Sequence, residues 1–472
     1  MKWNVGGMVN MNKMNYFKYL VKRHWKLELV ISAGLFMIVT VACITSVSDS
    51  MIFYVNIKEA CKEALIYLFY SGMFYSCAIS CFTPIYLNYY LYRKQSVDLY
   101  LSLPMKREKM YDTHFLYGCF SVVVPTVVCC IISVICLFVK GLDVTILPFQ
   151  IIGVIVLVNV ILQAIITLLS VKANKLLDAI VAAFGFIIVP LVVILSVYFT
   201  SSVLLSRTVV GFTLIGDELP FTGIISNLIS LPVIAFGAFE NFFNLKPITL
   251  TSSSLYYLLW WSVIGIIAYI YAKKSYVKRA AEDSEQYTSS KLIYPLMIHV
   301  GLASILMMIT LMESEYVVKF ILIGIIFLGY LVSMFFAHRK IKLRLVYVLT
   351  FVGIYVVTSL FTWSFEQTNG YGMVHEIPNI SQIKNIRVDY YYEEGSDYHY
   401  VNVNQSHFVE TYKKIESITQ SCVEVANDDD HYNMIDITYE LKNGNKIYRY
   451  YEFDEEKIHQ DALELIEMMT IK

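Results

Sequence analysis

Few side chains in the apolar parts of the sequence could do chemistry. They are His299, Asn88, Asn159 and Gln163. Asn159 and Gln163 are four residues apart, so a helix would place them one turn apart on the same face. There they would either line a polar path through a membrane or hydrogen-bond to neighbouring helices. His299 would be either a functional group within the membrane or a hydrogen-bonded histidine of a helix bundle.

The sequence lacks the common motifs of nucleotide-binding, hydrolytic and metal sites. It contains no GxxxxGK(S/T) loop, no HExxH, no GxSxG and no EF-hand loop, and its cysteines include no CxxC pair. Glu393 with Glu394, and Glu455 with Glu456, are adjacent rather than facing pairs, which does not favour acid–base catalysis. Asp428–His431 would either bind a cation or form a solvated loop. We therefore expect no enzyme, and no cofactor or metal bound by this chain.

The overall composition indicates a membrane protein. Of the 472 residues, 57% are hydrophobic and 16% are charged. A soluble chain is roughly 45–50% apolar and about 25% charged. The composition excludes a soluble enzyme, a disordered scaffold or a secreted disulfide domain as a description of the whole chain. The net charge of −1 gives no indication of a nucleic acid partner.

Nine segments of the sequence are apolar and long enough to cross a bilayer. A spanning helix needs about 20 mostly apolar residues, because the hydrocarbon layer is about 30 Å thick and each residue rises about 1.5 Å. The predicted spans are Leu29–Val47, Ala64–Leu91, Phe115–Val139, Leu147–Val171, Leu176–Thr200, Leu255–Ala272, Ile293–Leu311, Val317–Phe336 and Leu345–Trp363.

The distribution of positive charge predicts the orientation of these spans. With the N-terminus inside, the inside segments contain 22 lysine and arginine residues and the outside loops contain five. Because lysine and arginine accumulate on the cytoplasmic side, we expect a multi-pass protein of the cell (plasma) membrane with a cytoplasmic N-terminus. Nine spans then place residues 364–472, which contain 9 basic and 21 acidic residues, outside the cell.

Residues 1–28 precede the first span. Within Met14–Leu27, Phe17, Val21 and Trp25 occur at every fourth position, and lysine and arginine occupy much of the remaining surface. This pattern predicts an amphipathic helix in the cytoplasmic interface of the lipid bilayer, with aromatic rings among the headgroups and lysines near anionic lipid. The alternative is a plain basic flank of the first span.

A cytoplasmic segment at about residues 95–112, between the second and third spans, has the features of a docking element for a partner. Pro104 fits the first turn of a short helix, where its missing N–H is not needed. Leu99, Leu103 and Met110 would be apolar anchors within a charged rim. The alternative is an ordinary basic loop. The candidate docking residues are Asp98, Leu99, Leu103, Pro104, Met105, Lys106, Arg107, Glu108 and Lys109.

At these residues the sequence resembles the permease subunits of ABC-2 type exporters, which belong to the ABC transporters. The family pattern D-x-x-x-S-L-P-(M/I)-x-R-x-K is present as Asp98, Ser102–Met105, Arg107 and Lys109. The resemblance implies that this segment is a coupling helix that inserts into a separate ABC ATPase subunit, which would bind ATP and Mg²⁺. It also implies a second permease copy or a paralogue as a partner.

The resemblance covers about residues 1–285. It implies a six-helix permease core at 29–285, with short extracellular helices at about 201–254. Three additional spans at 286–363 and an extracellular domain at 364–472 depart from the simple family pattern. This layout resembles a Firmicutes-like subgroup with extra transmembrane helices and a C-terminal extracellular domain, often encoded beside exporters for antimicrobial peptides or for cell-envelope stress.

The C-terminal region combines strand patterns with helix patterns. Alternating apolar and polar residues are typical of half-buried strands, and Asn443-Gly444 is a favoured hairpin turn. This pattern predicts one α+β domain. Its many tyrosines would either capture cationic or amphipathic peptides or only pack the sheet. The predicted elements are strands at 386–391 and 400–403, a helix at 408–418, strands at 435–441 and 447–452, and a helix at 458–469.

Together these observations predict a polytopic α-helical membrane protein, with about nine transmembrane helices and a small C-terminal α+β extracellular domain. We expect the permease subunit of an ATP-driven ABC exporter for antimicrobial peptides, lipids or other envelope-active compounds. The spans are poor in charged residues that would couple transport to an ion gradient, so the energy would come from the partner ATPase. Two alternatives stay open: a non-transporting membrane sensor whose extracellular domain binds a ligand, and an autonomous channel.

Overall fold

The chain forms two compact units, and each is described by itself. The first unit comprises residues 1–191, 226–297 and 337–339, and the second comprises the remainder. The computed structural model describes residues 13–41, 43–46, 57–141, 146–204, 227–231, 253–286, 294–311, 316–338, 344–368, 379–394, 397–405, 412–418, 433–442, 446–453 and 456–470.

Eight described helices are long and apolar enough to cross a membrane by length and composition. Apolar runs in a bilayer fold as helices because a helix satisfies its backbone N–H and C=O groups internally. The prediction of a polytopic helical membrane protein is therefore confirmed. The eight helices are α1 (Lys13–Leu35), which continues into a π-helical segment η2 (Phe36–Val41), α3 (Ile57–Leu87), α5 (Arg107–Lys140), α6 (Leu147–Lys172), α7 (Leu176–Leu204), α10 (Ser253–Lys278), α12 (Tyr316–His338) and α13 (Leu345–Gln367).

A further apolar helix, α11 (Pro295–Leu311), coincides with the predicted span Ile293–Leu311. It has 17 residues and is shorter than the eight long helices. Proline fits its first position because the N–H groups of the first turn have no partner within the helix. The ninth crossing stays a prediction that depends on this helix.

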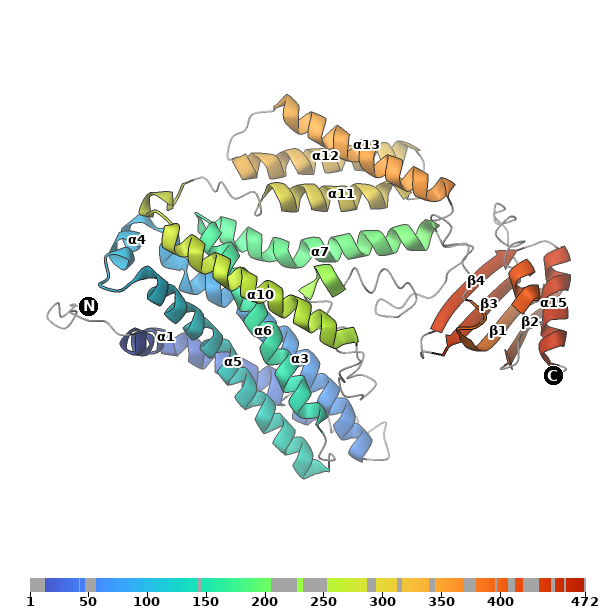
Figure 1. Ribbon diagram of the computed structural model, residues 1–472, viewed down its shortest axis with the longest axis horizontal. Helices are drawn as coiled ribbons and strands as arrows, with labels where there is room; N and C mark the ends of the chain where they lie inside the picture. The colour runs from blue at the N-terminus through green and yellow to red at the C-terminus, as the bar shows by residue number, and fades with distance from the viewer. Residues whose placement is uncertain are drawn as a thin grey trace. The chain divides into compact units, whose positions relative to one another are not determined.

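The first unit is built around α6 (Figure 1). This helix packs against α3, α5 and α10, and it is the most buried of the eight long apolar helices. Gly265 of α10 faces Ile161 of α6, where an added Cβ would lie only 3.4 Å from the Ile161 Cα. A small residue at this position allows close approach of the two helix backbones, as is common in membrane bundles.

The N-terminal helix packs against α5, a contact that the predicted interfacial pattern did not address. α1 runs from Lys13 to Leu35 as one helix and lies along α5. Its buried residues there are Tyr16 and Leu20, whereas Phe17 and Val21 are half-buried and Trp25 is exposed. Phe17 contacts the rings of Tyr117 and Phe120 of α5 by its edge. The position of this segment in a lipid interface stays a prediction.

The helices α11, α12 and α13 form a small bundle in the second unit. Leu302 and Leu306 of α11 share one apolar core with residues of α12 and α13. His299 of α11 places its Nε2 atom 3.4 Å from the hydroxyl of Tyr330 of α12. A contact of this kind, between polar groups of neighbouring helices, is expected for a hydrogen-bonded histidine of a helix bundle. The other members of the core are Tyr330, Met334, Tyr347 and Phe351.

The C-terminal residues form a four-stranded antiparallel sheet in the order β2-β1-β3-β4. The chain adds a short helix at 412–418 between the second and third strands, and a C-terminal helix. The elements are β1 (Ile383–Glu394), β2 (Asp397–Gln405), β3 (Asn433–Leu441), β4 (Lys446–Phe453) and α15 (Glu456–Thr470).

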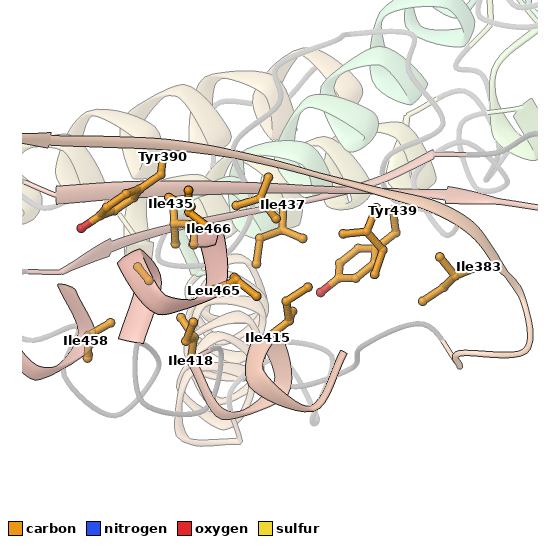
Figure 2. Packing of buried hydrophobic residues seen from close by; sticks show 13 residues of the cluster. Ile383, Tyr390, Ile415, Ile418, Ile435, Ile437, Tyr439, Ile458, Leu465 and Ile466 are labelled. Atoms are coloured by element: carbon orange, nitrogen blue, oxygen red, sulfur yellow. The ribbon is translucent and has the colours of Figure 1, made fainter. Parts of the chain in front are cut away.

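One face of this sheet packs on the helices. Alternate residues of a strand point to the same face, and Val388, Ile435 and Ile437 are fully buried on the covered face. Figure 2 shows Ile435 and Ile437 on the side of the sheet that faces Ile415 of the short helix and Leu465 of α15, and Val388 belongs to the same core. The core is therefore built from β-branched and aromatic strand residues and from the apolar side of an amphipathic helix.

Some predicted features lie outside the described residues. They are the Asn443-Gly444 turn, the acidic run Asp428–His431, the first residues of the predicted helix at 408–418 and most of the predicted extracellular stretch at 201–254.

The uncovered face of the sheet generates a prediction about pH. Asp436 of β3 stands directly opposite Asp389 of β1. Burial and then the charge of Asp389 raise the pKa of Asp436 to about 6. The folded state therefore holds this proton more tightly than the unfolded chain does. The protonated Asp436 stabilises the folded state below about pH 4, and this stabilisation is lost as the pH rises through 6.

We predict that Asp436→Asn stabilises the sheet at pH 7 by about 1–2 kcal/mol, after discounting for solvent screening. At pH 4 the same substitution should change the stability of the sheet little. Hydrogen exchange of β1 and β3 peptides, corrected for the intrinsic effect of pH, measures this. Glu440→Gln is the control, because Glu440 pairs only with the exposed Lys384 among the ion pairs described. An equal gain at both pH values would contradict the assignment.

Candidate docking element and polar core of the bundle

The predicted docking segment is divided between two helices. A short helix, α4, comprises Lys94–Leu101, a turn follows at 102–106, and the long helix α5 begins at Arg107. Pro104 therefore lies in the turn and not in the first turn of a helix, which corrects the sequence prediction. The proline ring disfavours a helical backbone at the preceding residue, Leu103, which explains why α4 does not continue through this position.

One side of α4 is exposed at the end of the bundle (Figure 1). Gln95, Asp98, Leu99 and Ser102 are exposed and follow the spacing of a single helix face. The side chain of Leu99 is 55% exposed, whereas Val97 on the opposite side is 1% exposed. Among the described side chains of α4, the exposed Leu99 is therefore an apolar residue within a polar stripe.

Buried tyrosines attach α4 to the bundle. The rings of Tyr100 and Tyr90 stack with their centroids 4.2 Å apart. The hydroxyl of Tyr90 lies 2.5 Å from that of Tyr276 of α10. Tyr90 belongs to a short 3-10 helix, η3 (Tyr89–Tyr92), between α3 and α4, and burial raises its pKa well above the ordinary value. A displacement of α4 would thus act on η3 and on the end of α10.

Arg279, just after α10, joins three segments of the first unit. Its guanidinium donates to the carbonyls of Val171, Ala173 (2.8 Å) and Leu91 (3.2 Å). The first two carbonyls lie at the end of α6, where a helix leaves its last C=O groups without internal partners. Arg279 is 7% exposed, and burial lowers its pKa. It remains charged, because arginine stays protonated in proteins.

Arg107 has a structural role that its predicted place on a charged rim did not indicate. From the first turn of α5 it donates to the carbonyls of Val277 (3.2 Å) and Arg279 (3.0 Å) at the end of α10. It is thus half-buried and paired with backbone. Among the other candidate docking residues, Asp98, Leu99, Pro104, Lys106, Glu108 and Lys109 are exposed, and Leu103 and Met105 are half-buried.

Asp112 joins α1, α5 and α10 at the same end of the bundle. Its carboxylate accepts hydrogen bonds from the hydroxyl of Tyr269 (2.7 Å) and the ammonium groups of Lys273 (3.0 Å) and Lys13 (3.2 Å). Asp112 is 14% exposed, whereas Lys13 is 46% exposed. The contact with Lys273 is therefore the better shielded of the two ion pairs.

Asn159 and Gln163 are both buried on α6, and the described contacts bond Asn159 to another helix. Its amide donates to the Ser76 hydroxyl and accepts from the Ser80 hydroxyl of α3, each at 2.7 Å. This favours the interhelical bond over the polar path for Asn159. The Gln163 Oε1 atom has no hydrogen-bond partner among the described protein atoms. A role of either residue in a translocation path stays a prediction.

Sequence reasoning missed Arg279, Asp112 and His114. A signal was available for Asp112 and His114, because an ionisable residue in the first turns of an apolar span needs a partner in the bundle. Arg279 appeared to be one of several cations in a basic tail, and only the three-dimensional structure shows that its guanidinium lies among backbone carbonyls.

We predict that Arg279→Lys destabilises the protein in detergent by about 2–3 kcal/mol, since a single ammonium group cannot replace a guanidinium that reaches three carbonyls. The thermal unfolding midpoint measures this. Arg93→Lys is the matched control, because the exposed Arg93 contacts only the face of Tyr89 among the interactions described, and it should change stability by less than about 1 kcal/mol. Equal shifts for both variants would contradict the role of Arg279.

Among the described residues, no group of three or more histidine, cysteine, aspartate or glutamate side chains is arranged to hold a metal ion. Comparison of the chain with protein-family models, with curated proteins and with solved structures finds no match.

Proposed function

We propose that this chain is the transmembrane permease subunit of an ATP-driven ABC exporter. A separate ATPase would bind ATP and Mg²⁺ and would dock on α4 and the following turn. The observation that carries the proposal is the construction of α4, which exposes Leu99 at the end of a helical bundle while Tyr100 and Val97 fix it to that bundle. A docking element must have both properties, because it has to contact a partner and pass on its movement.

The contacts behind α4 provide the route for this movement. Tyr100 stacks on Tyr90, Tyr90 meets Tyr276 of α10, and Arg279 connects η3 to the end of α6. Closure of the ATPases would thus displace α3, α6 and α10 together rather than α4 alone. Rigid-body reorientation of packed helices is an established way to switch between states.

The remaining parts of the proposal concern the subunits, the substrate and the orientation. Two copies, or this chain and a paralogue, would enclose the pathway, and antimicrobial peptides, lipids or other envelope-active compounds would be the substrates. The N-terminus would be cytoplasmic and the acidic region 364–472 extracellular, in accordance with the positive-inside rule. The competing function is a membrane sensor whose C-terminal domain binds a ligand, and such a sensor would act without an ATPase.

The docking proposal is tested at Leu99. A P-loop ATPase encoded in the neighbouring reading frame should co-purify with the wild-type chain. We expect Leu99→Asp to reduce the ATPase retained by about tenfold or more, because a charge replaces an apolar anchor in the interface. Arg107 is unsuitable for this test, because its substitution would release the end of α10.

Lys172→Glu is the control for the docking test. Lys172 is exposed at the end of α6 and is expected on the same side of the membrane, so this change alters charge without touching α4. It should leave binding unchanged. Undiminished binding by Leu99→Asp, with an unchanged thermal midpoint, would reject the docking role. Transport into vesicles that proceeds without the ATPase would reject the exporter itself.

The orientation is tested separately. A protease added to intact cells should reach residues beyond Ser364 and cleave the C-terminal region. The cytoplasmic side should become accessible only after the membrane is permeabilised. Protection of residues 364–472 in intact cells, together with cleavage after permeabilisation, would reverse the predicted orientation.

A further inference from the structure

A small cavity lies inside the first unit, between the end of α3 and the helices α5 and α6. Its polar lining consists of Asn88, His114, Gln163 and Thr167. All four residues are buried, with exposed fractions of 2–6%. The cavity is separate from the exposed side of α4 and from the ion pairs of Asp112.

Two polar atoms in this region have no hydrogen-bond partner among the described protein atoms. They are the Nδ1 atom of His114 and the Oε1 atom of Gln163. A buried polar atom that gives up water without gaining a partner destabilises the fold. Such atoms in a native protein are usually satisfied by ordered water.

The surrounding contacts hold both side chains in place. The Nε2 atom of His114 lies 2.6 Å from the hydroxyl of Tyr16, and the two rings stack with centroids 5.5 Å apart. Gln163 passes over Gly118 of α5, where an added Cβ would lie 2.3 Å from its Nε2 atom. Neither side chain can therefore turn freely to find another partner.

We propose that the cavity is a binding site for one water molecule, which bridges His114 Nδ1 and Gln163 Oε1. The space is that of about one water molecule, and Asn88 supplies a third polar neighbour. The walls contain no carboxylate or ammonium group among the described lining residues, so they suit a neutral ligand rather than an ion. Water also fits either tautomer of His114, because it can accept a hydrogen bond from Nδ1–H or donate one to a bare Nδ1.

The bridging water would join the Tyr16–His114 pair to Gln163, and each of these lies near further polar side chains. On one side are the hydroxyls of Tyr16 and, through the ring of Tyr90, of Tyr276. On the other side, one turn along α6 from Gln163, is Asn159 with its serine partners. The water would thus link α3, α5 and α6 at one level of the bundle.

A double-mutant cycle tests the bridge. His114→Leu and Gln163→Leu each take one partner from the water and so weaken its hydrogen bond to the opposite atom, whereas the double variant removes both atoms and lets the water leave. The drop in thermal midpoint of the double variant should therefore be smaller than the sum of the two single drops, by about 2 °C or more. The control cycle combines Gln163→Leu with Ser121→Ala, because the Ser121 hydroxyl is bonded to its own helix, and it should be additive.

A second measurement does not depend on the variants folding. A map of the wild-type protein at a resolution that shows ordered water should contain a density peak at hydrogen-bonding distance from both atoms. An empty cavity, or a direct contact between His114 and Gln163 that closes it, would overturn the proposal. An additive result in the His114–Gln163 cycle would overturn it as well.

Discussion

The end of a helix in an apolar bundle leaves backbone carbonyls without partners, and the first unit depends on how these carbonyls are satisfied. Arg279 donates to carbonyls after α6 and in η3, and Arg107 donates to carbonyls at the end of α10. At an exposed helix end, water could donate the hydrogen bonds that these carbonyls accept. Arg279 is almost fully buried, so at this helix end its guanidinium takes the place of water. These two arginines therefore fix the positions of the helix ends from which α4 projects.

This construction bears on how the proposed permease would work. α4 has eight residues, which is too few to hold a helix by itself in water. Its helical conformation is maintained by the packing of Tyr100 and Val97 on the bundle rather than by its intrinsic helix propensity. The same contacts that keep α4 helical also join it to η3 and α10, so the stability of the element and its ability to transmit force have one origin. Some of the buried polar side chains of the first unit, such as Asn159, bond between helices.

Much of the helical architecture was predictable, and the details of the site were not. Apolar runs identified the long helices because backbone satisfaction in lipid leaves the chain little choice. The alternation around Val388 and around Ile437 corresponds to strands with one covered face. The sequence did not reveal that Pro104 separates two helices, that Tyr16 is buried against α5, or that Arg107 and Arg279 bind backbone. Those features depend on which helices become neighbours, and a periodic pattern does not contain that information.

The length of α11 has a consequence for the surrounding lipid. Seventeen residues extend about 25 Å, whereas an average hydrocarbon layer measures about 30 Å. If α11 spans the membrane, the bilayer beside it must become thinner or the flanking polar side chains must snorkel, at a cost of a fraction of a kcal/mol for each ångström of mismatch. Lipids with shorter acyl chains would then gather beside this helix, and the thickness of the host membrane would become a variable to which the second unit responds.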